Sequence, residues 1–173
     1  MYKSRFDFAE LDLIKDRGKR ILYCHSYLKF LGEGCYRQVF LLPNGKVLKV
    51  ANSHDAYDCN LREEKIYYAA PEKYRKNLLK VFYSHPKGWY LVCERVKTYI
   101  SRKDFPFFDP TETDYQWKNA PTWPQTRGAR IRFRKLRNTT RHLVKEYGLN
   151  DLSNPDNWGT RKSGKFVIID YAS

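Results

Sequence analysis

The sequence predicts an α+β fold, and three observations carry this prediction. The first 96 residues alternate short β-rich runs with one helical segment, in the order β-β-β-α-β-β. A strongly basic helical segment then fills residues 126–147. A turn-rich stretch at 150–159 and a short apolar strand at 166–170 follow it. Strands grouped in one half of a chain and a long helix in the other are typical of this class.

Composition indicates a folded protein outside the membrane. The chain has 173 residues, and 42% of them are hydrophobic, including 14 Tyr, 10 Phe and 4 Trp, which is enough for a core. No apolar run approaches the roughly 20 residues of a membrane span. Charged residues in the first seven positions, Met1 to Asp7, do not fit a secretory signal, so we expect a cytoplasmic location.

Charge and cysteine spacing restrict the partners. The formal net charge of +14 favours acidic surfaces such as a nucleotide, a nucleic acid or an acidic protein. The cysteines stand alone at positions 24, 35, 59 and 93, without the paired spacing of a zinc site. We therefore expect free thiols and no zinc.

The amino-terminal elements follow from local patterns. Apolar residues at helical spacing predict a helix over residues 6–17, with acidic residues early and basic residues late. Three β-rich runs follow at 21–31, 36–42 and 46–51, and the Pro-Asn-Gly sequence at 43–45 predicts a tight turn between the last two.

Three further elements and a boundary complete the first half. A helix is predicted over 60–70, and strands are predicted over 78–83 and 89–96. Four prolines among residues 104–124 exclude a long regular element there. We therefore expect one domain at 1–96 and a second at 97–173, in which Gly148 ends the basic helix.

Two glycines, Gly32 and Gly34, mark the turn between the first two predicted strands. A Gly-x-Gly turn on its own fits an ordinary hairpin. Here it leads into a strand and then, across the 43–45 turn, into an apolar strand that contains Lys49. A lysine between Leu48 and Val50 requires a partner, because an unpaired buried ammonium group is costly.

This order resembles the small lobe of protein kinases, in which a glycine-rich hairpin covers the nucleotide and a lysine on the third strand reaches its α and β phosphates. The resemblance implies that Glu63, with Glu64 as the alternative, pairs with Lys49. It also implies that Cys93 lies behind the adenine and that the backbone of Glu94 and Val96 binds it. The implied nucleotide-binding residues are Gly32, Gly34, Val39, Lys49, Glu63, Cys93, Glu94 and Val96.

The carboxy-terminal region resembles the kinase catalytic loop and the strand that ends in a metal-binding aspartate. The resemblance implies that Asp151 is the catalytic base beside Lys49, and that Asn157 and Asp170 bind Mg²⁺. The spacing from Asp151 to Asn157 is one residue longer than in the kinase pattern, so Asp156 is an alternative ligand. These roles require Lys49 and Asp170 to face one cleft.

The sequence also departs from the kinase pattern. Arg37 replaces the third glycine. The loop that covers the phosphates therefore either has a less permissive backbone or contacts the phosphates through the guanidinium itself. Leu149-Asn150 replaces the usual His-Arg, and Tyr171-Ala172 replaces Phe-Gly. The sequence contains no activation segment after Asp170, which predicts a truncated helical large lobe, as in the small kinase-like proteins of bacteriophages that this chain resembles.

Three functions remain open at this stage. The first is a minimal ATP- and Mg²⁺-dependent phosphotransferase acting on Ser/Thr of an acidic or host protein, with a small-molecule kinase as a variant. The second is a pseudokinase that binds a host protein without turnover. The third is a nucleic-acid-binding protein, which would use the basic helix through Arg127, Arg130, Arg134, Arg137 and Arg141.

Overall fold

A computed structural model describes residues 5–98, 127–149, 152 and 154–171, and it confirms the α+β class. Contacts between Cα atoms divide the chain into two units. The first unit contains Met1–Tyr68 and Lys80–Arg95, and the second contains Ala69–Leu79 and Val96–Ser173. Residues 69–79, which the sequence analysis assigns to the amino-terminal domain, thus belong to the second unit.

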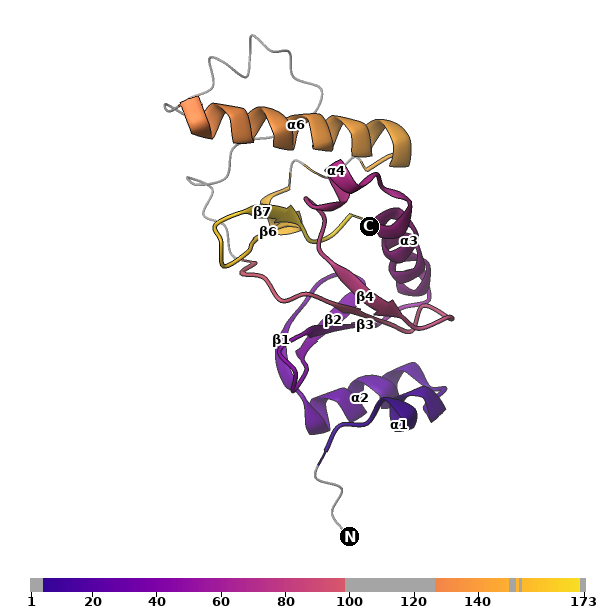
Figure 1. Cartoon of the computed structure of the whole chain (residues 1–173). Coiled ribbons are helices and arrows are strands. Elements are labelled where there is room, and N and C mark those ends of the chain that lie inside the picture. Colours follow the sequence, from indigo (N-terminus) through magenta and orange to yellow (C-terminus); the bar gives the residue numbers. More distant parts are fainter. Residues whose placement is uncertain (1–4, 99–126, 150–151, 153, 172–173) are drawn as a thin grey trace. The chain divides into compact units, whose positions relative to one another are not determined.

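A five-stranded antiparallel sheet forms the centre of the first unit, with the strand order β1-β2-β3-β5-β4 (Figure 1). The predicted turn joins β2 to β3, and in it the Asn44 side-chain oxygen accepts a hydrogen bond from the Lys46 N–H at 3.1 Å. The strands are β1 (Lys29–Glu33), β2 (Arg37–Leu41), β3 (Val47–Ala51), β4 (Val81–Ser84) and β5 (Tyr90–Cys93).

Strand register assigns the side chains to two faces of this sheet. Val39 of β2 is paired with Lys49 of β3, which is paired with Leu91 of β5. Directly paired residues share a face and alternate residues along a strand share it too. Arg37, Val39, Leu41, Val47, Lys49, Leu91 and Cys93 therefore lie on one face, and Phe40, Leu48, Val50, Tyr90 and Val92 lie on the other.

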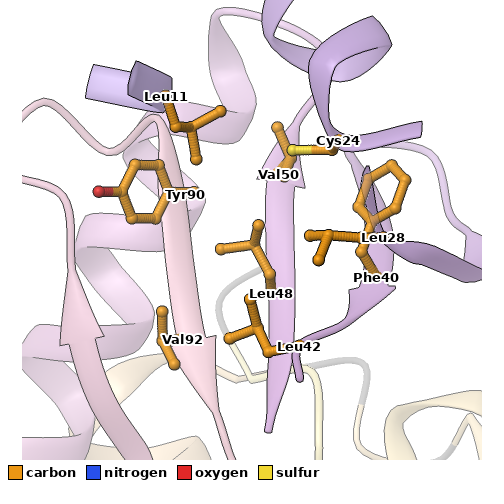
Figure 2. Packing of buried hydrophobic residues seen from close by; sticks show 9 residues of the cluster. All are labelled: Leu11, Cys24, Leu28, Phe40, Leu42, Leu48, Val50, Tyr90 and Val92. Atoms are coloured by element: carbon orange, nitrogen blue, oxygen red, sulfur yellow. The ribbon is translucent and has the colours of Figure 1, made fainter. Parts of the chain in front are cut away.

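Two helices, α1 (Phe8–Leu13) and α2 (Arg17–Tyr27), cover the face without Lys49. Figure 2 shows Leu11 of α1, Cys24 of α2 and the following Leu28 beside side chains of β2, β3 and β5. Leu11, Cys24, Phe40, Leu48 and Val50 are completely buried, so this layer is the hydrophobic core of the unit.

Two sequence predictions for residues 6–31 are wrong, and both concern the region of helix α2. The single helix expected over 6–17 ends at Leu13, and the β-rich run expected over 21–31 is helical as far as Tyr27. The Asp16 carboxylate starts the new helix by accepting a hydrogen bond from the Lys19 N–H at 2.8 Å. Burial of Cys24 and Leu28 against the sheet then outweighs the local β propensity.

Helix α3 (Asp55–Ala69) begins five residues before the predicted helix. The Ser53 hydroxyl accepts a hydrogen bond from the Ala56 N–H at 3.2 Å at its amino-terminal end. Asn60 and Glu63, three residues apart on α3, are both completely buried. Buried polar side chains at this spacing lie on one side of the helix.

The second unit combines helices with a short hairpin. Its elements are α4 (Glu72–Arg75), α6 (Arg127–Tyr147), the 3-10 helix η1 (Pro155–Asn157), β6 (Trp158–Thr160) and β7 (Phe166–Ile168). The Asn77 amide donates to the Thr139 hydroxyl at 2.7 Å, and the Tyr74 ring stacks on His142 of α6. Among the described residues, no helix is both long and apolar enough to span a bilayer.

Candidate functional site

Lys49 of β3 forms a buried ion pair with Glu63 of α3. The Lys49 Nζ lies 2.8 Å from Glu63 Oε1, and their side chains are 9% and 0% exposed. This confirms the pairing expected for Lys49 and selects Glu63 over Glu64. Glu64 is only half-buried, and burial raises the pKa of its carboxyl.

Arg37 of β2 binds the same carboxylate. Its Nη1 lies 2.5 Å from Glu63 Oε2, and its side chain is 6% exposed. The sequence left open whether this guanidinium contacts the phosphates of a nucleotide. In the structure it is paired with Glu63. Each oxygen of the Glu63 carboxylate therefore accepts from a different cation, Lys49 on Oε1 and Arg37 on Oε2.

Asn60 extends this network and was not foreseen from the sequence. Its Oδ1 accepts from Arg37 Nη1 at 3.4 Å, and its Nδ2 donates to the Gly88 carbonyl at 2.8 Å. The signal that could have identified it is the helical spacing of three residues between Asn60 and Glu63. The network joins β2, α3 and the turn before β5.

Apolar residues lie beside Lys49 and Arg37 on this face of the sheet. Val39, half-buried, is paired with Lys49 in the register, and Cys93 is buried two residues along β5 from Leu91. Burial raises the pKa of the Cys93 thiol to about 12, so it stays neutral. A Cβ added at Gly32 or Gly34 would meet no atom within 4 Å, so the backbone of the glycine turn is open to close approach.

Glu94 and Val96 fall in different units. The Glu94 N–H donates to the Lys80 carbonyl and its carboxylate accepts from the Lys80 N–H, both at 2.9 Å. This N–H is therefore already used, which argues against its part in the adenine contacts expected of Glu94 and Val96. Their binding of adenine stays a prediction.

In the second unit, backbone hydrogen bonds bring Asn157 and Asp170 together. The Asn157 carbonyl accepts from the Ile169 N–H at 2.8 Å and from the Asp170 N–H at 3.5 Å. Asn157 is buried and Asp170 is half-buried. Asp156 is exposed and its N–H donates to Asn154 Oδ1, so Asn157 is the residue that adjoins Asp170.

Buried aromatic residues anchor the segments around these two residues. The Trp158 indole donates to the Leu152 carbonyl at 2.8 Å, and the Tyr171 hydroxyl donates to the Leu79 carbonyl at 3.2 Å. Asp151 lies outside the described residues, next to the buried Leu152. Its role as a base, and the cleft expected between Lys49 and Asp170, stay predictions.

Helix α6 presents part of the predicted basic surface. Arg134 and Arg141 are exposed, whereas Arg137 is buried at 7% exposure. The prediction that Arg137 belongs to the basic surface was therefore wrong. Arg137 lies at the border of the buried side of α6, three residues before the buried Thr140. The side chains of Arg127 and Arg130 lie outside the described residues.

No protein-family model and no curated protein sequence matches this chain. The solved structures that are similar to it include the following two. An apo pseudokinase shares 10% identity at a TM-score of 0.38, over 86% of this chain and 58% of that one. The choline kinase LicA from Streptococcus pneumoniae shares 16% identity at a TM-score of 0.42, over 91% of this chain and 69% of that one. Both likenesses are weak, so functional conclusions depend on the residues themselves.

Proposed function

We propose that this chain is an ATP- and Mg²⁺-dependent phosphotransferase of the protein-kinase type. The observation that carries the proposal is the buried Lys49–Glu63 pair beside apolar residues on one face of the sheet. An apolar surface suits a nucleobase, and an ammonium group fixed by a carboxylate suits the adjoining phosphates. Val39 and Cys93 on the same face supply the apolar part.

Each residue has a defined task in this proposal. Lys49 binds the α and β phosphates, and Glu63 keeps its ammonium oriented. The open backbone at Gly32 and Gly34 allows the turn to approach the phosphates. Asp151 orients the acceptor hydroxyl and accepts its proton as the new phosphoester bond forms and the bond from the γ phosphorus to ADP breaks, which releases ADP.

Asn157 and Asp170 fit a magnesium ion by their chemistry. Mg²⁺ takes oxygen ligands and is commonly held by one or two side chains together with substrate phosphates. Asn157 and Asp170 offer such oxygens on residues that backbone hydrogen bonds hold together. The ion would neutralise charge on the phosphates, and the two residues would fix its position.

Phosphoryl transfer tests this proposal directly. Labelled ATP and Mg²⁺ are incubated with the protein and either a dephosphorylated cell lysate or a set of small hydroxyl compounds, and ADP release is followed. Lys49→Met and Asp170→Ala should each lower transfer at least about 100-fold, because both remove charge that acts on the phosphates. The acceptor that becomes labelled separates protein from small-molecule substrates.

Matched controls separate chemistry from folding. Lys29→Met changes an exposed lysine of β1, and Asp156→Ala changes the exposed neighbour of Asn157. Both variants should keep wild-type transfer. ATP binding without transfer under any condition would overturn the proposal and favour the pseudokinase. Absence of ATP binding in calorimetry would overturn the nucleotide site itself.

Nucleic-acid binding is a second candidate, which the exposed side of α6 favours. Arg134, Lys135, Arg141 and Lys145 are all exposed, and their spacing places them within one side of the helix. Four cations along about 16 Å can contact successive phosphates of a nucleic-acid strand. The opposite side of α6 carries the buried Leu136 and Leu143.

Salt titration distinguishes this candidate from the first. Binding of duplex RNA or DNA should weaken steeply with salt, with a slope of about 0.9 for each phosphate neutralised. The double substitution Arg134→Glu and Arg141→Glu should abolish binding, whereas Lys162→Glu, at an exposed turn, should leave most of it. Loss of binding in Lys49→Met, with α6 unchanged, would contradict this candidate.

A further inference from the structure

The Glu63 carboxylate is held from two strands at once. Lys49 comes from β3 and Arg37 from β2, and each donates to a separate oxygen. All three side chains are at least nine-tenths buried. A carboxylate bound on one oxygen can still rotate about its last bond, whereas a second partner on the other oxygen removes this freedom. The orientation of Glu63 is therefore set by both cations.

Arg37 is also joined to α3 at a second point. Its contact with Asn60 lies one turn of α3 before Glu63, and Asn60 in turn donates to the Gly88 carbonyl. Residues three apart on a helix are neighbours on its surface, so Arg37 spans two adjacent positions of α3. A planar guanidinium with five N–H donors suits this task better than a lysine ammonium.

We propose that Arg37 is a positioning residue that fixes Glu63, and through it the Lys49 ammonium, before a nucleotide binds. This inference rests on the proposed function, because it assigns Lys49 to the phosphates. The Lys49–Glu63 pair is then assembled permanently, and no separate step is required to bring α3 into place. The residue that replaces the third glycine of the loop thus acts on the phosphates only indirectly.

Arg37→Gln tests the proposal, since glutamine keeps polarity and removes the charge. Affinity for ATP should fall about tenfold or more, the size expected when a hydrogen bond between charged groups is lost. Affinity for adenosine should stay near the wild-type value, because Lys49 acts on the phosphates. Arg37→Lys should recover part of the ATP affinity. A purely structural role for Arg37 would weaken ATP and adenosine alike, and that result would overturn the proposal.

Hydrogen exchange provides a readout that needs no nucleotide. Amide protons of α3 should exchange faster in Arg37→Gln than in wild type or in Arg62→Gln, which changes an exposed arginine next to Glu63. Unchanged exchange in a folded Arg37→Gln protein would overturn the positioning role. Faster exchange in a protein whose wild type binds no ATP would support the positioning role and reject the proposed function. If Arg37→Gln does not fold, Arg37→Lys is measured in both assays.

Discussion

Helices on the two faces of the five-stranded sheet are attached by different kinds of contact. Helices α1 and α2 pack through apolar side chains such as Leu11 and Cys24, which belong to the same buried cluster as Leu48 and Val50 (Figure 2). Helix α3 buries Ala56 and Ile66 as well, but it is also attached by hydrogen bonds and ion pairs of Glu63 and Asn60. Two neighbouring residues of β3, Leu48 and Lys49, thus take part in unlike contacts.

The difference separates stability from chemistry. Apolar packing is non-directional and accepts many partners of suitable volume. A buried carboxylate such as Glu63 requires specific partners at hydrogen-bond distance, because an unpaired buried charge is costly. The side with α1 and α2 therefore holds a large apolar cluster, and the side with α3 holds charged groups in fixed orientations.

Truncation of Leu48 should have the largest effect on stability. Leu48 is completely buried between the sheet and the helices, so Leu48→Ala should lower the free energy of unfolding by about 2–5 kcal/mol. ATP affinity of the folded fraction should not change, because Leu48 points away from the Lys49 face. Chemical denaturation and calorimetry measure the two quantities.

Val39→Ala is the matched substitution on the other face. Val39 is half-buried and paired with Lys49, so the loss of stability should be only about 1 kcal/mol while ATP affinity falls. If Leu48→Ala weakened ATP binding as strongly as Val39→Ala, the assignment of separate tasks to the two faces would fail.

A loss of stability smaller than that of Leu48→Ala is expected at Gly88, where the backbone approaches α3. A Cβ on this residue would lie 2.2 Å from the Tyr57 carbonyl oxygen, and the φ of +69° is strained for any other residue. Gly88→Ala should cost about 2–4 kcal/mol in the free energy of unfolding. Faster hydrogen exchange in α3 should accompany this loss, because Gly88 accepts from Asn60.

Gly45→Ala isolates the backbone strain. Gly45 has a similar φ of +78°, yet a Cβ there meets no atom within 4 Å. This variant should lose only about 1–2 kcal/mol and leave the exchange of α3 unchanged. Equal losses in the two variants would show that close approach to Tyr57 contributes nothing.

Much of the α3 side of the sheet could be predicted from the sequence. Val39 and Lys49 are each five residues from Asn44, at the centre of the turn, so a regular hairpin pairs them. The lysine in an apolar strand requires a buried partner, and Glu63 on the next helix satisfies this requirement. The end of α6 at Gly148 also follows from local chemistry, because its φ of +66° suits glycine.

Other features depend on contacts that a local pattern does not contain. Ile21 and Tyr23 of α2 have high β propensity, and burial of Cys24 against a distant sheet, together with the Asp16 cap, favours the helix. Arg37 lies on the Lys49 face by strand alternation, but its choice of Glu63 depends on where α3 packs. The hairpin of β6 and β7 was missed at Trp158–Thr160, since a three-residue strand leaves almost no alternation to detect.

A polar cluster on the α1 side of the sheet surrounds His85. The imidazole stacks on Trp89 with ring centroids 4.4 Å apart, and its Nδ1 accepts from the Lys87 N–H at 3.1 Å. Its Nε2 lies 3.8 Å from Asp12 of α1. Desolvation lowers the pKa of His85, the charges of Arg20 and Lys87 lower it further, and Asp12 opposes them. Protonation of Nδ1 would remove its acceptor, so the folded state favours the neutral ring.

Acid should therefore weaken the first unit through His85, with a smaller effect than the substitutions above. Above a pH of about 6.5 the ring is neutral in both states and contributes no pH dependence. Below this pH, His85 binds a proton more readily in the unfolded state than in the folded state, so the free energy of unfolding decreases as the pH decreases. The melting temperature between pH 7.5 and 5.5 should decline less in His85→Gln than in wild type. His54→Gln, at an exposed histidine, should follow the wild type. Parallel declines in wild type and His85→Gln would mean that the α1 side owes its acid sensitivity to other groups.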